Sequence, residues 1–214
     1  MRCIITAGPT FEPLDRVRRL TNHSTGSLGT GLANHFAMLG FETVLLRGSL
    51  STAEPPVAAV RMVSFGTVEE LGARLADESD PGPVAVFHAA AVGDYRFGEV
   101  IQEQADGTRS VVVGGKIATR GGRLFAELLP TRKLLPGLRD LFPLGRIVGW
   151  KYEVDGNRDS VLDRCRHQLQ EARTDLSIAN GPAYGAGFGW VTATEHRILP
   201  DAPALYEALA TLAS

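Results

Sequence analysis

The 214-residue sequence is poor in cysteine, in aromatic side chains and in long apolar runs. Its two cysteines, Cys3 and Cys165, are too few for a disulfide framework and lack the clustering of a zinc site. No stretch approaches the roughly 18–20 apolar residues that span a bilayer, and the run Cys3–Ala7 is shorter than the core of a secretory signal. We therefore expect a protein of the reducing cytoplasm with no membrane partner.

An excess of one charge is also missing, since 22 basic and 24 acidic residues leave a net charge of −2. This balance disfavours a general nucleic-acid binder, which needs a basic surface, and we expect no nucleic-acid partner. The length suits one globular domain, which can bury roughly 70% of its unfolded surface. We predict a single domain over residues 1–214.

Short apolar runs alternate with segments of helical spacing along most of the chain. The continuous run Val84–Ala91 predicts a strand covered on both faces. Ser24 is a candidate cap for a helix that ends before Gly40. The other predicted strands are Arg2–Ala7, Phe41–Leu46, Val60–Phe65, Leu124–Leu129, Ile147–Val154 and Asp175–Ala179, and the predicted helices are Ser24–Leu39, one capped by Thr67, Arg132–Phe142, Asp159–Arg173 and Ala202–Leu212.

The alternation of strands and helices predicts βαβ units and therefore the α/β class. We expect a three-layer Rossmann-like fold with a mostly parallel sheet, plus a flap and a C-terminal β-hairpin. The flap is expected at about 97–122, where glycine, charged and β-branched residues mix without an apolar face. The hairpin is predicted from Gly187–Val191 and His196–Leu199. Ligands of open parallel sheets bind beyond the carboxyl ends of the strands, so the loops Gly8–His23, Ala91–Gly122 and Asn180–Gly187 are the candidate site.

A glycine cluster, Thr25–Gly31, lies at the start of the first predicted helix. Free N–H groups and the helix dipole suit a phosphate or carboxylate there, although the same glycines also fit close packing of a helix on a sheet. A nicotinamide-dependent reductase is disfavoured because the spacing is not G-x-G-x-x-G and the cluster starts some 18 residues after the first strand. No tyrosine has a lysine four positions later.

The segment Ile5–Gly26, which reads ITAGPTFEPLDRVRRLTNHSTG, resembles the signature of phosphopantothenoylcysteine synthetase. Further blocks resemble that family in the same order. They are Ala89–Arg96, Lys116-Ile117 with the following glycines, Val148–Glu153 and Ile178–Asn180. No decarboxylase block accompanies them, so we expect the stand-alone form of the ligase.

The resemblance implies that 4′-phosphopantothenate and cysteine are joined at the expense of a nucleoside triphosphate, ATP or CTP, with Mg²⁺. The substrate carboxylate attacks the α-phosphorus, pyrophosphate leaves, and the cysteine amine attacks the acyl-nucleotidyl anhydride. Such chemistry depends on cations and dipoles placed around phosphate charge, in a site shielded from water. The resemblance also implies a homodimer in coenzyme A biosynthesis.

The resemblance further assigns roles to individual residues. Asn22 would contact the substrate carboxyl group and the intermediate, and Lys116 on the flap would reach the triphosphate. Ser24 and Gly26 would direct backbone donors to phosphate. The bland alternatives are a turn asparagine, a solvated loop lysine and a plain N-cap.

Other residues match the nucleotide side of the family's site. They are Ala90, Ala91 and Asp94 near base and ribose, Trp150 stacking on the base, Lys151 sharing the phosphate role and Asn180 reading a base edge. On the substrate side, Arg18 corresponds to the family's arginine and would hold the substrate phosphate or carboxylate. Trp150 is equally compatible with core packing. Asn180 is also compatible with a loop asparagine whose side chain hydrogen-bonds to its own backbone. His88 reads as a hydrogen-bonded core histidine.

This sequence departs from the family at several positions. Arg16 replaces proline, and Gln168 and Ala172 stand where CTP-using enzymes carry lysines. With Lys151 present, the pattern leans toward ATP, while CTP stays open. A reductase, or a nucleotide-binding relative without turnover, remains the alternative.

Overall fold

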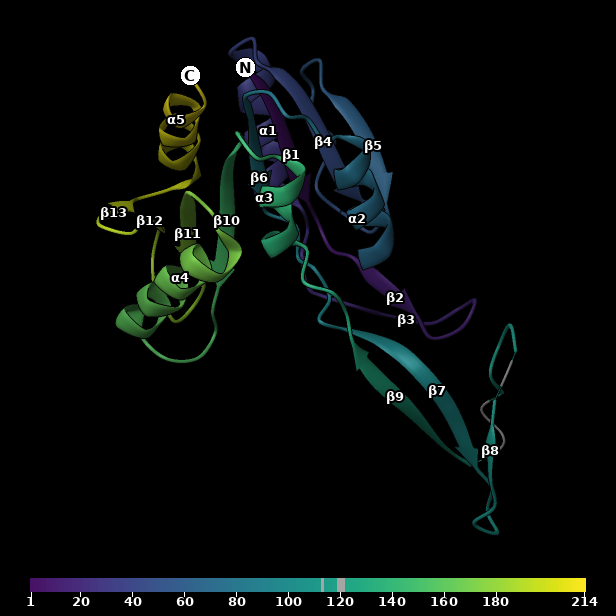
Figure 1. The fold of residues 1–214 in the computed structure, drawn as a ribbon. Helices are drawn as coiled ribbons and strands as arrows, with labels where there is room; N and C mark the ends of the chain where they lie inside the picture. The colour runs from purple at the N-terminus through teal and green to yellow at the C-terminus, as the bar shows by residue number, and fades with distance from the viewer. Residues whose placement is uncertain (113, 119–121) are drawn as a thin grey trace.

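The computed structural model describes residues 1–112, 114–118 and 122–214. Its centre is an eight-stranded sheet in the order β13-β12-β11-β10-β6-β1-β4-β5 (Figure 1). The six strands from β11 to β5 are parallel, and β12 and β13 add an antiparallel hairpin at one edge. The predicted class, the mostly parallel sheet and the C-terminal hairpin are confirmed.

The sheet strands are β1 (Arg2–Ala7), β4 (Glu42–Gly48), β5 (Arg61–Phe65), β6 (Val84–His88), β10 (Arg146–Tyr152), β11 (Leu176–Asn180), β12 (Phe188–Val191) and β13 (His196–Leu199). The helices are α1 (Ser27–Met38), α2 (Val68–Asp77), η2 (Leu135–Gly137), α3 (Leu138–Leu141), α4 (Arg158–Ala172) and α5 (Ala202–Ala213). The chain moves outward from β1 to β4 and β5, then returns through α2 to β6 on the other side of β1. The carboxyl ends of β1 and β6 therefore flank the point where the strand order reverses, which is where such sheets bind ligands.

Side chains alternate between the two faces of the buried strands, and each face has its own core. Cys3, Ile5 and Ala7 of β1 pack with α1 and α5 on one face. Ile4 packs with α2 and α3 on the other, and α4 covers the β10–β12 end of that same face. This two-sided burial explains why the strands read as continuous apolar runs, and it gives the three predicted layers.

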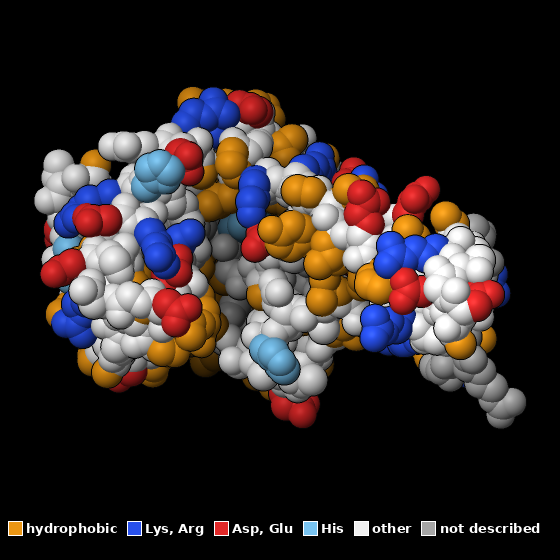
Figure 2. Space-filling view, turned by 90° about the horizontal axis from the view of Figure 1, so that it is seen from below, with side chains coloured by type: hydrophobic (Ala, Val, Ile, Leu, Met, Phe, Trp, Pro, Cys, Tyr) orange, Lys and Arg blue, Asp and Glu red, His pale blue; other side chains and the backbone are white. Residues whose placement is uncertain are grey.

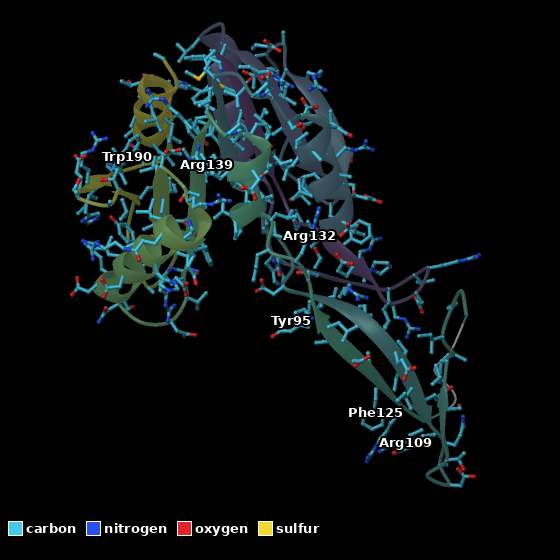
Figure 3. All side chains as sticks on the ribbon, in the orientation of Figure 1. Tyr95, Arg109, Phe125, Arg132, Arg139 and Trp190 are labelled. Carbon is cyan, nitrogen blue, oxygen red and sulfur yellow. The ribbon has the colours of Figure 1, made fainter. Side chains whose placement is uncertain are left out.

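An antiparallel arm projects from the carboxyl ends of the strands (Figure 1). It consists of β7 (Tyr95–Glu103), β8 (Arg109–Val111) and β9 (Arg123–Pro130), with β7 in the middle. Tyr95 lies at its root, and Phe125, under the Arg109 guanidinium at 5.0 Å, lies toward its far end (Figure 3). Within the expected flap, residues 97–103 and 109–111 are strand, and the predicted strand Leu124–Leu129 lies within β9. The sequence did not reveal β7 and β8, because strands of a sheet exposed to water on both faces have no alternating apolar pattern.

Two predicted helix boundaries are also wrong. Helix α1 begins at Ser27 with Gly26 as its N-cap, and no side chain caps it, so Ser24 is not the cap. The predicted helix Arg132–Phe142 is reduced to η2 and the one-turn helix α3. Pro136 explains the second case, because a residue without an N–H cannot join the hydrogen-bond ladder inside a helix.

Candidate functional site

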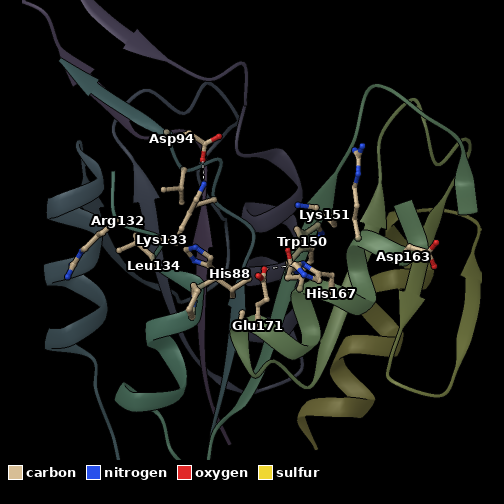
Figure 4. A pocket seen from close by; sticks show the side chains of 18 residues that line it. His88, Asp94, Arg132, Lys133, Leu134, Trp150, Lys151, Asp163, His167 and Glu171 are labelled. Carbon is tan, nitrogen blue, oxygen red and sulfur yellow. Dashed lines mark hydrogen bonds and ion pairs between the residues drawn. The ribbon is translucent and has the colours of Figure 1, made fainter. Parts of the chain in front are cut away.

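A pocket of about 650 Å³ opens at the carboxyl ends of β6 and β10, beneath α4 and η2. Figure 2 shows the hollow on this face of the molecule, between the α4 side and the side that carries the arm. Four parts of the chain line the pocket: the end of β6 with the following loop, the segment around η2, the end of β10, and α4 (Figure 4). In this order the lining residues are His88, Ala90, Val92, Gly93 and Asp94; Arg132–Pro136; Trp150 and Lys151; and Asp163, Arg164, His167, Gln168, Glu171 and Ala172.

The loop after β6 is tied to the loop after β1 by hydrogen bonds. The Ala90 N–H donates to Thr6 Oγ1 at 3.0 Å, and the Ala91 N–H donates to the Gly8 carbonyl at 3.0 Å. Two residues further on, the Gly93 N–H donates to Thr10 Oγ1 at 2.8 Å. All three donors are backbone N–H groups of the loop after β6, and two threonine hydroxyls and the Gly8 carbonyl accept from them, so β1 and its following loop hold the pocket rim in place.

Asn22 joins the first sequence block to the second. It follows the hairpin formed by β2 (Phe11–Pro13) and β3 (Arg19–Thr21), and its Nδ2 donates to the Val92 carbonyl at 3.1 Å. A smaller cavity of about 280 Å³ lies here and shares Gly93 and Asp94 with the main pocket. The structure thus places Asn22 beside the predicted nucleotide loop.

Helix α1 starts next to this region. Gly26 adopts φ 78°, and a Cβ on it would lie 2.8 Å from Ser51 Oγ and 3.2 Å from Gly8 Cα. Only glycine fits this junction, which brings the start of α1 against the end of β1. Ser24 borders a cavity of about 340 Å³ together with Asn22. Ser24 and Asn22 therefore border one cavity, and Gly26 lies buried behind it at the start of α1.

The basic side chains of the pocket are all paired with acids at or near its rim. Lys133 binds Asp94 (Figure 4), Lys151 lies 3.5 Å from Glu153, and Arg164 binds Glu153 as well. Exposed ion pairs contribute only about 0–1 kcal/mol each. A phosphate chain can therefore replace Asp94 as the partner of Lys133 at little cost, because both of these side chains are exposed.

Arg18 and Lys116 lie in a separate cluster, which we call the Asp15 anchor. The Asp15 carboxylate accepts from the Arg18 guanidinium and from the Ile117 N–H, and Arg18 donates to the Ile117 carbonyl. The Arg16 N–H donates to the Gly115 carbonyl at 3.0 Å. These bonds hold the pKa of Asp15 well below its usual range, mainly through the Arg18 guanidinium. Neither Arg18 nor Lys116 lines the 650 Å³ pocket.

Two further predicted residues lie at the margin of the pocket. Trp150 borders it, but its side chain packs with the core under α1 and α5, and its buried Nε1 has no partner among the described residues. Asn180 ends β11 and does not line the pocket; its buried Oδ1 likewise lacks a partner within the described ranges. Ala90 and Asp94 of the loop after β6 and Lys151 of β10 line the pocket, whereas Ala91 does not, and the roles of all four remain predictions.

Several lining residues escaped the sequence reading. His88 is buried as expected, with Nδ1 3.0 Å from Thr6 Oγ1, but it also lines the pocket. Lys133 follows the arm, whose path the sequence did not reveal. One feature of the sequence could have indicated that α4 lines the pocket, because a helix that only covers a core seldom turns a polar stripe toward a strand end. This feature is the row of polar residues at spacings of three and four, Asp163, Arg164, His167, Gln168 and Glu171.

Comparison with known proteins identifies the family. The model of the DNA/pantothenate metabolism flavoprotein C-terminal domain matches residues 1–202. The chain belongs to this family. This confirms, at the level of the family, the resemblance found in the sequence.

Curated relatives include the coenzyme A biosynthesis bifunctional proteins CoaBC of Thermococcus kodakarensis and Bacillus subtilis. They are 30% and 31% identical over 84% and 87% of this chain. The alignments cover 41% and 42% of those relatives, so the chain spans about two fifths of their length.

Solved structures share the fold. The DNA/pantothenate metabolism flavoprotein from Streptococcus pneumoniae has a TM-score of 0.85 at 22% identity, covering 99% of this chain and 97% of that one. A Cab2 mutant in complex with phosphopantothenate-cysteine has a TM-score of 0.68 at 19% identity, covering 99% and 88%. Within the described ranges of this chain, no helix is long and apolar enough to cross a membrane.

Proposed function

We propose that this chain ligates 4′-phosphopantothenate and L-cysteine in coenzyme A biosynthesis. The pantothenate carboxylate attacks the α-phosphorus of a nucleoside triphosphate, and pyrophosphate leaves with the electron pair of the broken P–O bond. The cysteine amine then attacks the acyl carbon, loses a proton and expels the nucleoside monophosphate. Membership of the family and the CoaBC relatives support this assignment.

The observation that carries the proposal is the hydrogen bond from Asn22 to the Val92 carbonyl. It joins the first sequence block that resembles the ligases, which is the longest, to the second across 70 residues of chain. A neutral amide at this position can donate to a carboxylate or acyl oxygen without holding it as a salt. Donors placed where negative charge develops usually contribute more to the rate of such reactions than any other group.

The remaining groups fit binding of the triphosphate. Lys133 and Lys151 offer charge at the pocket rim, with Arg164 beside them on α4. Lys116 would act only after moving in from the Asp15 anchor, as a flap residue does when a site closes.

Mg²⁺ fits this site as part of the nucleotide complex. Among the described residues, no group of three or more histidine, cysteine or acidic side chains could hold a metal ion. Mg²⁺ commonly keeps several waters and binds mainly to substrate phosphates, with one or two carboxylates. Asp94, freed from Lys133, is the acid of the pocket loop that could supply such a ligand. When bound, the ion would neutralise charge on the phosphates.

The test is release of pyrophosphate by the purified protein. We expect release only when Mg²⁺, a triphosphate and 4′-phosphopantothenate are all present, and formation of 4′-phosphopantothenoylcysteine on addition of cysteine. Running ATP and CTP in parallel decides the nucleotide, for which the sequence leans toward ATP. Triphosphate binding without turnover, or oxidation of a reduced nicotinamide, would contradict the proposal and favour one of the alternatives.

We also propose a homodimer in a reducing cytoplasm. The arm exposes Tyr95, Val111, Phe125 and Leu128, which supports a partner surface there. Both cysteines are free and buried, and burial raises the pKa of Cys3 to about 12, which suits proteins that form no disulfides. Light scattering of the purified chain measures the oligomeric state.

A further inference from the structure

His88 occupies the floor of the 650 Å³ pocket. It is the last residue of β6, lies opposite Thr6 in the register with β1, and is 7% exposed. Three of the pocket's described lining residues are buried, His88, Leu134 and Ala172, and His88 is the polar one. The neighbouring strand β10 has Gly149 in register with His88, so no side chain from that position covers the ring. Figure 4 shows the imidazole among the lining side chains.

The hydrogen bonds around Thr6 determine which ring nitrogen carries the proton. Thr6 Oγ1 already accepts from the Ala90 N–H at 3.0 Å and lies 3.0 Å from His88 Nδ1. The hydroxyl has one proton to donate, and Nδ1 is its acceptor among the described residues. If Nδ1 were instead the donor, the buried hydroxyl proton would lose its partner, which is costly. His88 is therefore the Nε2–H tautomer.

The ring is also uncharged at neutral pH. Burial lowers the pKa of His88 to about 4, because the positive form would lose its hydration. Since Nδ1 is occupied, the ring offers a neutral N–H donor on Nε2, for which the described residues provide no partner. A neutral donor on a buried floor suits an uncharged acceptor atom of a ligand.

Charge in the pocket is arranged from rim to floor. Arg132, Lys133 and Arg164 are exposed at the rim together with the acids Asp94, Asp163 and Glu171. The less exposed lining combines the apolar Leu134 and Ala172 with the uncharged polar groups of His88 and Gln168. A nucleoside triphosphate would place its phosphates beside the rim cations and its uncharged base at the floor. The pocket volume of about 650 Å³ lies within the usual range of small-molecule sites.

We propose that His88 is a specificity-determining residue that donates from Nε2–H to an acceptor atom, a ring nitrogen or carbonyl oxygen, on the base of the bound nucleotide. This inference rests on the proposed function, because it takes the nucleotide as the occupant of the pocket. It adds a base-reading role for a residue outside the sequence blocks that resemble the ligases. Thr6 acts as the positioning residue that sets the tautomer.

The experiment combines His88→Phe with nucleotide analogues that lack one acceptor. Binding of a non-hydrolysable form of the preferred triphosphate is measured by calorimetry, alongside a set of analogues in each of which one acceptor of the base is removed, either a ring nitrogen replaced by C–H or a carbonyl oxygen replaced by hydrogen. We expect His88→Phe to weaken binding of the parent nucleotide about 10- to 100-fold. The analogue that lacks the acceptor for His88 should bind the wild type as weakly as the parent nucleotide binds His88→Phe. Its affinity for His88→Phe should equal its affinity for the wild type.

Two comparisons separate recognition from folding. His88→Gln retains an N–H donor and should recover part of the affinity, and His35→Phe, on the opposite face of the sheet, controls for loss of a histidine. The Nε2–H proton of the wild type, observed by NMR, should shift on nucleotide binding, which requires no variant to fold.

Equal weakening of every analogue by His88→Phe, or unchanged binding of the parent, would overturn the inference while leaving ligation intact. Absence of triphosphate binding by the wild type would instead overturn the proposed function.

Discussion

Replacing Thr6 by valine removes the hydroxyl that connects β1, β6 and the pocket loop, and leaves the shape of the side chain almost unchanged. Two groups lose their partner, the Ala90 N–H and His88 Nδ1, each 3.0 Å from Oγ1. Thr6 is fully buried, so water does not replace the hydroxyl. An unsatisfied buried group costs about 1–3 kcal/mol, and the added methyl returns part of this, so we expect a loss of about 2–4 kcal/mol.

The assay is chemical unfolding, with the midpoint and slope fitted together. A loss near 3 kcal/mol also lowers Tm by roughly 6–12 °C for a chain of this size. Thr30→Val is the matched control, because Thr30 is 4% exposed and its Oγ1 has no partner among the described residues. We expect that control to be neutral or slightly stabilising. If Thr6→Val costs no more than Thr30→Val, the hydroxyl does not make the bonds that determine the His88 tautomer.

Three further predictions concern pH, catalysis and packing. Burial lowers the pKa of His88 to about 4, so between about pH 6.5 and 4 the ring binds a proton in the unfolded chain but not in the folded one. The contribution of His88 to the free energy of unfolding therefore falls by about 3 kcal/mol as the pH drops through this range. When unfolding is measured at pH 7 and pH 4.5, His88→Leu should lose less free energy of unfolding between the two pH values than the wild type. Asn22→Ala should lower kcat of pyrophosphate release about 10²- to 10³-fold with unchanged Tm, and unchanged turnover would remove its assigned role. Gly29→Ala should lower the free energy of unfolding by about 1–3 kcal/mol, because its Cβ would lie 2.7 Å from Ala7 Cβ and 3.0 Å from the Thr6 carbonyl; an unaltered midpoint would refute the close packing of α1 on β1.

The parts of the fold that the sequence predicts are those whose burial produces a pattern. Val84–His88 is covered on both faces and forms a largely apolar run, and the hairpin of β12 and β13 is formed by the two predicted segments. Of the arm, the sequence predicts β9, as Leu124–Leu129. Strands β7 and β8 lack such a pattern, because they are largely exposed and their pairing is set by register between separate segments. The predicted helix Arg132–Phe142 fails for a different reason. Its apolar spacing is typical of a helix, but Pro136 prevents a continuous helix there.

The candidate site likewise contains residues that the sequence predicts and residues that only the fold reveals. The resemblance identified Asn22, Ala90 and Asp94, which the structure places within one continuous region. It did not identify Lys133, since the path of the arm decides where this residue returns to the pocket. His88 was read correctly as a hydrogen-bonded histidine, yet its exposure to the pocket depends on Gly149 of a strand about 60 residues later. Sequence spacing carries no information on that contact.

The Asp15 anchor has a consequence for the segment around Lys116. Every hydrogen bond described between the anchor and positions 115 and 117 uses the main chain of those positions, through the Gly115 carbonyl and the N–H and carbonyl of Ile117. The lysine side chain takes part in none of them, so its chemistry and its attachment to the body are independent. A substitution at position 116 therefore changes the side chain carried there without removing any of these backbone hydrogen bonds.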